Sequence, residues 1–143
     1  MWTNIDIVQK ESFIGRLPRD SGTKSLPLPG KEIIPEGTKE ILVYAWVWIG
    51  TGVYPQSNWH YKIFVDADNH GHVAAQYLYA HTDPNITVNS FAINSDTFWL
   101  PMPVDRTLRV ERIFIKREAG IPEEPPPIGG PYFESEIRVI GYR

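Results

Sequence analysis

The chain lacks cysteine, and it lacks an excess of basic residues. The absence of cysteine excludes a disulfide framework, a thiolate metal site and a cysteine nucleophile. The 14 lysines and arginines are spread among 17 acidic residues, for a formal net charge of -3. No apolar run is long enough to cross a bilayer as a helix, and no signal peptide is visible. We therefore expect no nucleic-acid partner and no membrane insertion.

Convincing helical patterns are also missing, whereas the signals for short strands are frequent. The sequence holds 13 prolines and 11 glycines between segments rich in valine, isoleucine and aromatic residues. Its 143 residues fit a single domain, 1–143, with a core of its own. We expect an irregular segment at 10–37 and an exposed proline-rich loop at 120–131. The pattern predicts an all-β fold, an antiparallel β-sandwich of jelly-roll type with roughly eight strands and little or no helix.

The uncharged run 41–49 is the expected central strand. At a strand's period of two, its faces are Ile41, Val43, Ala45, Val47 and Ile49 on one side and Leu42, Tyr44, Trp46 and Trp48 on the other. A sandwich strand needs only one apolar face. We expect the second face to form an oligomer interface with sister subunits, with a second sheet layer or a ligand as alternatives. A closed homo-oligomer, most simply a trimer, would follow.

A β-hairpin is predicted by the two strand-like segments 60–67 and 72–81. With a three-residue loop that ends at Gly71, Ile63 would pair with Tyr77. A two-residue loop would instead pair Ile63 with Gln76 and bury the glutamine. We therefore expect the register with the glycine bulge.

Two interruptions are expected further along the chain. The polar triplet 94–96 is typical of a turn, which would separate a strand at 86–93 from another at 97–102. The apolar alternation also changes parity between Val110 and Ile113. A β-bulge at Glu111–Arg112 would restore it.

Candidates for a metal site occur only at the predicted hairpin tip, at Asp66, Asp68, His70 and His72. Carboxylates and imidazoles suit a divalent transition metal, but a solvated turn is the simpler interpretation. The sequence has no nucleophile elbow, phosphate loop or dinucleotide fingerprint. We expect no enzyme, no metal and no cofactor.

Aromatic residues are abundant, with five Trp, seven Tyr and six Phe. Trp59 stands in an expected loop beside Asn58, Gln56 and His60, which can form hydrogen bonds. This group is the candidate ligand-binding site, most simply for carbohydrate. The alternative is that Trp59 folds back to cap the core. Asn85 begins a glycosylation sequon, which matters only in a eukaryotic secretory pathway.

Three stretches carry a resemblance to known proteins. Ile-Pro-Glu-Gly-Thr-Lys-Glu-Ile-Leu-Val-Tyr at 34–44, Asn-Ser-Asp-Thr-Phe-Trp-Leu-Pro-Met at 94–102 and Ile-Gly-Tyr-Arg at 140–143 are similar to segments of jelly-roll heads. Such heads occur in fibre proteins and at the C-termini of collagen-like animal proteins. The resemblance spans roughly the last hundred residues. It implies a non-catalytic trimeric head that recognises a partner or a glycan, and it assigns no binding residue.

These observations favour a recognition and assembly head that binds carbohydrate and self-associates through the aromatic strand face. We expect it outside cells or on a virion or fibre surface. The alternatives are a structural subunit of a fibre, capsid or filament and, third, a metal-dependent jelly-roll enzyme.

Overall fold

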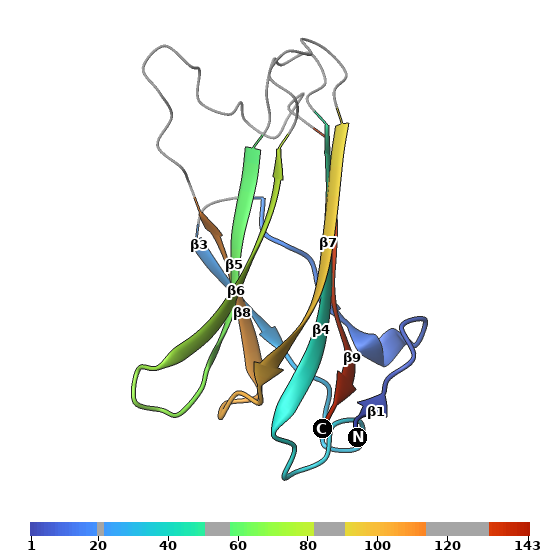
Figure 1. The fold of residues 1–143 in the computed structure, drawn as a ribbon, viewed down its shortest axis with the longest axis vertical. Helices are drawn as coiled ribbons and strands as arrows, with labels where there is room; N and C mark the ends of the chain where they lie inside the picture. The colour runs from blue at the N-terminus through green and yellow to red at the C-terminus, as the bar shows by residue number, and fades with distance from the viewer. Residues whose placement is uncertain (20–21, 51–57, 82–90, 114–131) are drawn as a thin grey trace.

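The structure is a computed structural model, and it describes residues 1–19, 22–50, 58–81, 91–113 and 132–143. Gln56, Asn85 and the predicted loop 120–131 lie outside the described residues, as do the side chains of Asn58 and Tyr132. The described chain forms two β-sheets packed face to face (Figure 1). The elements in chain order are β1 (Thr3–Asn4), η1 (Lys10–Ser12), β2 (Phe13–Gly15), β3 (Gly22–Pro27), β4 (Glu40–Gly50), β5 (Asn58–Asp66), β6 (Val73–His81), β7 (Phe91–Pro101), β8 (Thr107–Ile113) and β9 (Tyr132–Tyr142).

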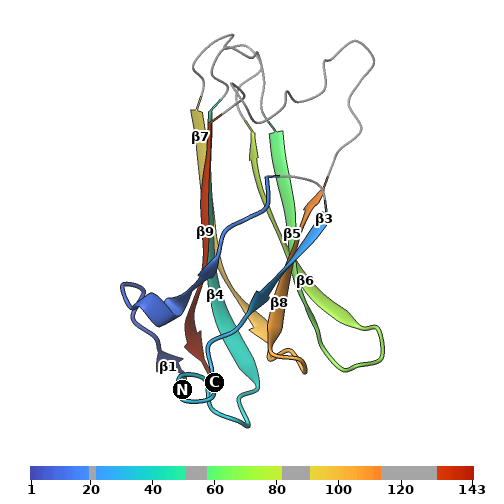
Figure 2. The same ribbon diagram turned by 180° about the vertical axis from the view of Figure 1, so that it is seen from behind.

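The strand order is that of a jelly roll. Sheet A has the order β1-β9-β4-β7, with β2 also paired to β9, and sheet B has the order β3-β8-β5-β6. Every pairing is antiparallel, and from β3 onward each strand lies in the other sheet from the strand before it, except β6, which follows β5 in sheet B (Figure 2). The predicted antiparallel sandwich of jelly-roll type is confirmed. The only helical element of the described residues is the 3₁₀ turn η1. Among these residues, no helix is long and apolar enough to cross a membrane.

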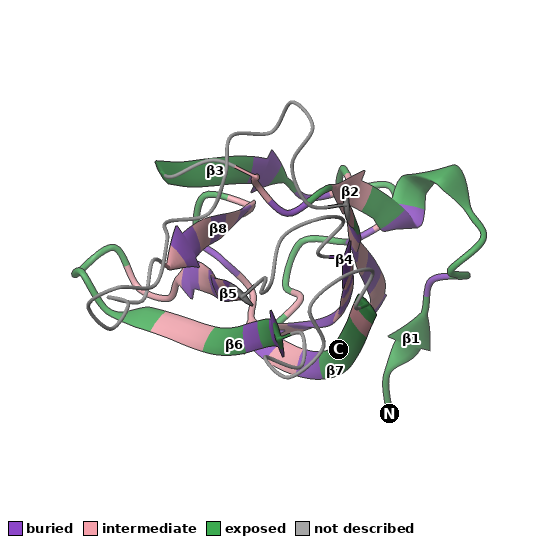
Figure 3. Ribbon diagram, turned by 90° about the horizontal axis from the view of Figure 1, so that it is seen from above, coloured by how far each residue is buried: buried purple, intermediate pink, exposed green. Residues whose placement is uncertain are grey.

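The core lies between the sheets and is organised around β4. This strand is central in sheet A, where it pairs with β7 on one side and β9 on the other. Its predicted inner face is confirmed, since the side chains from Ile41 to Ile49 at odd positions have no exposed surface. Opposite them, sheet B contributes the buried side chains of Tyr61, Ile63, Val65, Leu108 and Val110 (Figure 3). The outer positions of β4 remain for other contacts.

The register of the β5–β6 hairpin differs from the prediction. Ile63 pairs with Gln76, and the N–H of Ala67 donates to the carbonyl of His72 at 2.9 Å. The predicted glycine-bulge register is therefore wrong. The prediction excluded the observed register on the expectation that it would bury Gln76, but β6 is the edge strand of sheet B and Gln76 is exposed. The observed register turns Tyr77 and the other odd-numbered residues of β6 toward the outer face.

The two predicted interruptions are also wrong. The polar triplet 94–96 lies inside β7 as exposed residues of an edge strand, where no second sheet neighbour requires apolar side chains. β8 runs without a register shift, and Arg112 takes the inward place in the pattern instead of Ile113. Segment 10–37, expected to be irregular, contains η1, β2 and β3. Pro27 ends β3, an edge strand, where its missing N–H costs no ladder bond.

Candidate recognition surfaces

The outer face of sheet A carries a continuous row of large apolar side chains. The even positions of β4 point outward, and Leu42 pairs with Trp99 of β7 while Trp48 pairs with Ile93. Leu42 is buried among these neighbours, and the three aromatic side chains of β4 are half-buried. We call this row the aromatic stripe, and its members are Trp2, Leu42, Tyr44, Trp46, Trp48, Phe91, Ile93 and Trp99. The four side chains predicted to form an interface thus share one face.

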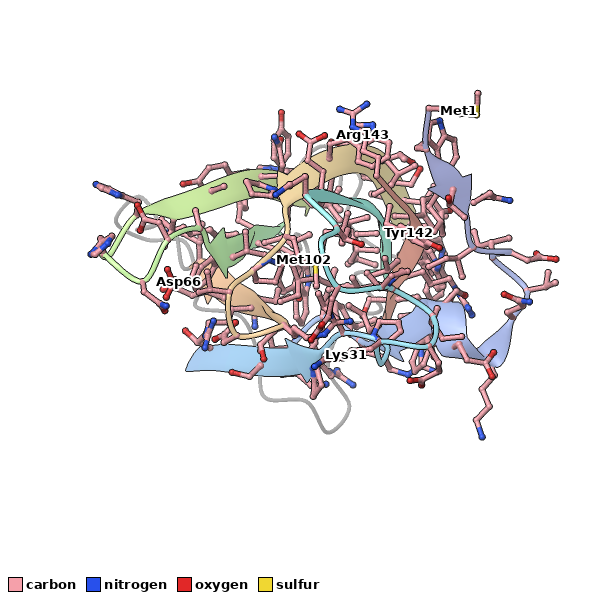
Figure 4. The ribbon with its side chains drawn as sticks, turned by 90° about the horizontal axis from the view of Figure 1, so that it is seen from below. Met1, Lys31, Asp66, Met102, Tyr142 and Arg143 are labelled. Carbon is pink, nitrogen blue, oxygen red and sulfur yellow. The ribbon has the colours of Figure 1, made fainter. Side chains whose placement is uncertain are left out.

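One end of the aromatic stripe is built where the two chain termini meet. The ring of Trp2 stands edge-on to Trp99, with 5.8 Å between the ring centroids. Trp2 lies over Gly141, where an added Cβ would come within 2.6 Å of the indole ring. The guanidinium of Arg143 lies 4.1 Å from the centroid of Trp99 and also pairs with Glu40. Figure 4 shows Met1 and Arg143 on this side of the molecule, away from Asp66 on the sheet B hairpin.

The other end of the aromatic stripe is the more exposed. Trp48 and Phe91 stack with 5.4 Å between centroids and 13° between ring planes. Ile93, between them and the centre of β7, is 71% exposed. Single exposed apolar side chains are common on protein surfaces, whereas a contiguous set is a candidate interaction surface.

The charges beside the aromatic stripe are tied into pairs within the chain. Glu136 of β9 accepts hydrogen bonds from Arg138 Nε at 3.0 Å and from Trp46 Nε1 at 3.2 Å. The bond from Arg138 lowers the pKa of Glu136 most, and the bond from Trp46 lowers it further. Partial burial raises the pKa, but the net effect is a pKa below the ordinary value. Arg138 Nη1 also donates to the carbonyl of Ile7 and to Ser12 Oγ, both at 2.9 Å. These pairs let charged groups border an apolar surface without being left unpaired.

The outer face of sheet B has a different character. Where β5 begins and β6 ends, three rings contact one another. His60 and Tyr79 stack with 5.4 Å between centroids, and His81 stands edge-on to both, 4.4 Å from His60 and 5.4 Å from Tyr79. Lys62 follows on β5, and it pairs with Tyr77 of β6 on one side and with β8 on the other. This face therefore mixes rings with charged groups.

Trp59 is part of the core, which corrects the exposed position that we expected for it. It is 3% exposed, stacks on Phe133 at 4.5 Å between centroids and has the guanidinium of Arg112 3.7 Å from its ring. Trp59 shares the inward face of β5 with Tyr61. The alternative, that Trp59 folds back onto the core, describes what is observed. Of the predicted binding group, only His60 has a described side chain that reaches an outer face.

The hairpin tip uses its acids to hold the turn. Asp68 pairs with the ring of His72 through Nδ1 and accepts the N–H of His70 at 2.9 Å. These bonds, the one from His72 foremost, lower the pKa of Asp68. Asp66 accepts the N–H of Asn69 at 3.2 Å. Within the described ranges, no group of three or more His, Asp or Glu side chains is placed to hold a metal ion.

The prediction from sequence missed the ends of the aromatic stripe and the ring cluster on sheet B. Trp99 could have been found, since it alternates with the inward Phe98 and Leu100 of the same strand. The predicted pairing of Ile63 with Tyr77 also placed Tyr79 on the inner face, whereas the observed register places it on the outer face. No sequence pattern could have placed Trp2 in the aromatic stripe, because its position depends on the pairing of the two chain termini.

No protein-family model matches this chain, and no curated protein matches it either.

Proposed function

We propose that the protein is a non-catalytic head domain that self-associates through the aromatic stripe, most simply as a homotrimer, and that recognises a partner. The observation that carries the proposal is a face of large rings on the central strand and its neighbours. Such a face lowers its free energy by leaving water. The resemblance to trimeric heads of fibre and collagen-like proteins supports the same reading, and so an extracellular or virion location.

The composition of the aromatic stripe supports a protein partner. Interface cores are enriched in tryptophan, tyrosine and phenylalanine and depleted in charge, with polar groups at the rim. Along the stripe the charged neighbours lie on β9 and at the termini, already paired as Glu136 with Arg138 and Arg143 with Glu40. Association would therefore bury rings without breaking these ion pairs.

A second copy of the chain is the simplest partner, because a closed ring of identical copies buries every stripe. The structural alternative, a subunit of a fibre, capsid or filament, would use the same rings in contacts that do not close. The two differ in how mass depends on concentration. A closed trimer reaches a fixed mass, whereas an open assembly keeps growing.

The test is sedimentation equilibrium of the purified protein at micromolar concentration. We expect three times the protomer mass for the wild type. Ile93→Glu puts a charge into the stripe, and an unpaired buried charge weakens association by about 2–5 kcal/mol. The matched control is Val73→Glu, an equally drastic change on the exposed edge strand of sheet B, which should leave the mass unchanged. A wild-type monomer at micromolar concentration, or a trimer that tolerates Ile93→Glu, would refute the proposal.

A further inference from the structure

We infer that the outer face of sheet B binds a pyranose sugar of a glycan, with Tyr79, which contacts His60 and His81, as the stacking platform. This inference deepens the recognition role proposed above, but it uses the face opposite the aromatic stripe and does not depend on self-association.

The ring of Tyr79 is held in place before a ligand arrives. The rings of His60, Tyr79 and His81 contact one another in pairs, with centroid distances of 4.4 to 5.4 Å. The backbone beneath is fixed too, since the carbonyl of Tyr79 accepts a hydrogen bond of 2.8 Å from Asn94 Nδ2 on the edge of sheet A. Tyr79 is nevertheless 54% exposed. A rigid, exposed ring loses little conformational entropy when a ligand stacks on it.

Polar groups share the outer face of sheet B with Tyr79. Tyr77, 57% exposed, stands two residues from Tyr79 on the same face, so that the two side chains follow each other along the edge of the sheet. Lys62 pairs with Tyr77 and with Glu111 on the neighbouring strands. Hydroxyl, imidazole, ammonium and carboxylate groups thus offer both donors and acceptors within one face. A pyranose matches this set, since one of its faces is apolar and its rim consists of hydroxyls.

A sugar suits this face better than a second copy of the chain or a nucleic acid does. A second copy of the chain would place Lys62, Glu111 and Arg109 inside an interface, and interface cores are depleted in such residues. A nucleic acid or a strongly anionic partner needs a surface of one sign, whereas the charges here have both signs. A neutral sugar needs neither an apolar interface core nor a field of one sign.

The test is saturation-transfer NMR of the full chain with the methyl pyranosides of glucose, galactose, mannose and N-acetylglucosamine, followed by an array of immobilised oligosaccharides. We expect wild type to bind at least one probe, and Tyr79→Ala to bind it about tenfold more weakly, as for the loss of one ring contact. Tyr79→Phe keeps the ring and should stay within about threefold of wild type. Val73→Ala, on the same face of the same strand, should bind as wild type does.

Two results would overturn the inference. One is the absence of binding to every probe and every array glycan, and the other is binding that Tyr79→Ala and His81→Ala both leave unchanged. His81 is exposed at the end of β6, so its variant gives a second reading if Tyr79→Ala does not fold. Sedimentation of the same samples keeps the two proposals apart. A monomer that binds sugar contradicts only the assembly, and a trimer that binds none contradicts only the sugar site.

Discussion

The outer faces of the two sheets both carry aromatic rings, but their surroundings differ. On sheet A, the rings of Trp46 and Trp48 belong to the aromatic stripe, whose neighbouring charges are already paired. On sheet B, Tyr79 contacts two imidazoles and shares its face with Lys62 and Glu111 of the neighbouring strands. Aromatic content alone therefore does not identify a binding surface. The residues between the rings indicate whether a protein or a small polar ligand suits the face.

The two faces are expected to differ most in how much one arginine on each contributes to the free energy of unfolding. On sheet A, Arg138 donates to Glu136, to the carbonyl of Ile7 and to the buried Ser12. Arg138→Ala removes these bonds together and leaves acceptors without their charged donor. We expect the free energy of unfolding to fall by about 2–3 kcal/mol.

The matched control on sheet B is Arg109→Ala. Arg109 pairs with Asp105 at 2.6 Å, and both side chains are about one-third exposed, so solvent screens the pair. We expect a loss of at most about 1 kcal/mol. Both variants should be unfolded in urea at one protomer concentration, because association would contribute to stability. Equal losses for the two arginines would contradict the view that only sheet A has charges built into its face.

The next prediction concerns the contact of Trp2 with Gly141, which shapes one end of the aromatic stripe. A Cβ at position 141 would come within 2.6 Å of the indole, so Gly141→Ala must displace the ring from its contact with Trp99. Trp2 is partly exposed and can move, and the expected cost is about 1 kcal/mol, at the low end for overpacking. Near-UV circular dichroism should change together with stability.

A double-mutant cycle gives the control for this contact. In a Trp2→Ala background most of the clash is absent, so Gly141→Ala should cost clearly less than it does in the wild type. A cost that is the same in both backgrounds would mean that the carbonyl of Thr3, 3.1 Å from the added Cβ, is what resists the substitution. In that case Trp2 would not be a packed member of the stripe.

The sequence was sufficient for the fold class and for both faces of β4, and it failed where strand order mattered. The run from Ile41 to Ile49 has no polar residue, so its alternation could be assigned without knowing its neighbours. The hairpin register required knowing that β6 is an edge strand where Gln76 can stay in water. A turn was predicted at the polar residues 94–96 for the same reason, because the edge position of β7 was not known. Edge positions follow from long-range pairing, which one sequence does not display.

The prediction that Trp59 is exposed was wrong for a reason that the sequence did contain. Trp59 has the parity of Tyr61, Ile63 and Val65, which face inward on β5. Extending that strand by two residues would have assigned Trp59 to the core and His60 to the outer face. The partners of His60 could not have been found in this way, because Tyr79 and His81 join it only in the observed register.

The smallest expected effect is a dependence of stability on acid pH that comes from Glu136 on the outer face of sheet A. Hydrogen bonds from Arg138 and Trp46 hold the pKa of Glu136 below its ordinary value of 4.5. A carboxyl with a lowered pKa in the folded state contributes stability above its unfolded pKa, and this is lost as pH falls through the folded pKa. Between about pH 6 and pH 3, Glu136→Gln should therefore lose less stability than wild type, by less than about 1 kcal/mol. Trp46→Phe keeps the bond from Arg138, so its loss of stability over this pH range should lie between those of wild type and Glu136→Gln. Identical urea midpoints for wild type and Glu136→Gln at every pH would show that Glu136 contributes nothing to the stability of this face.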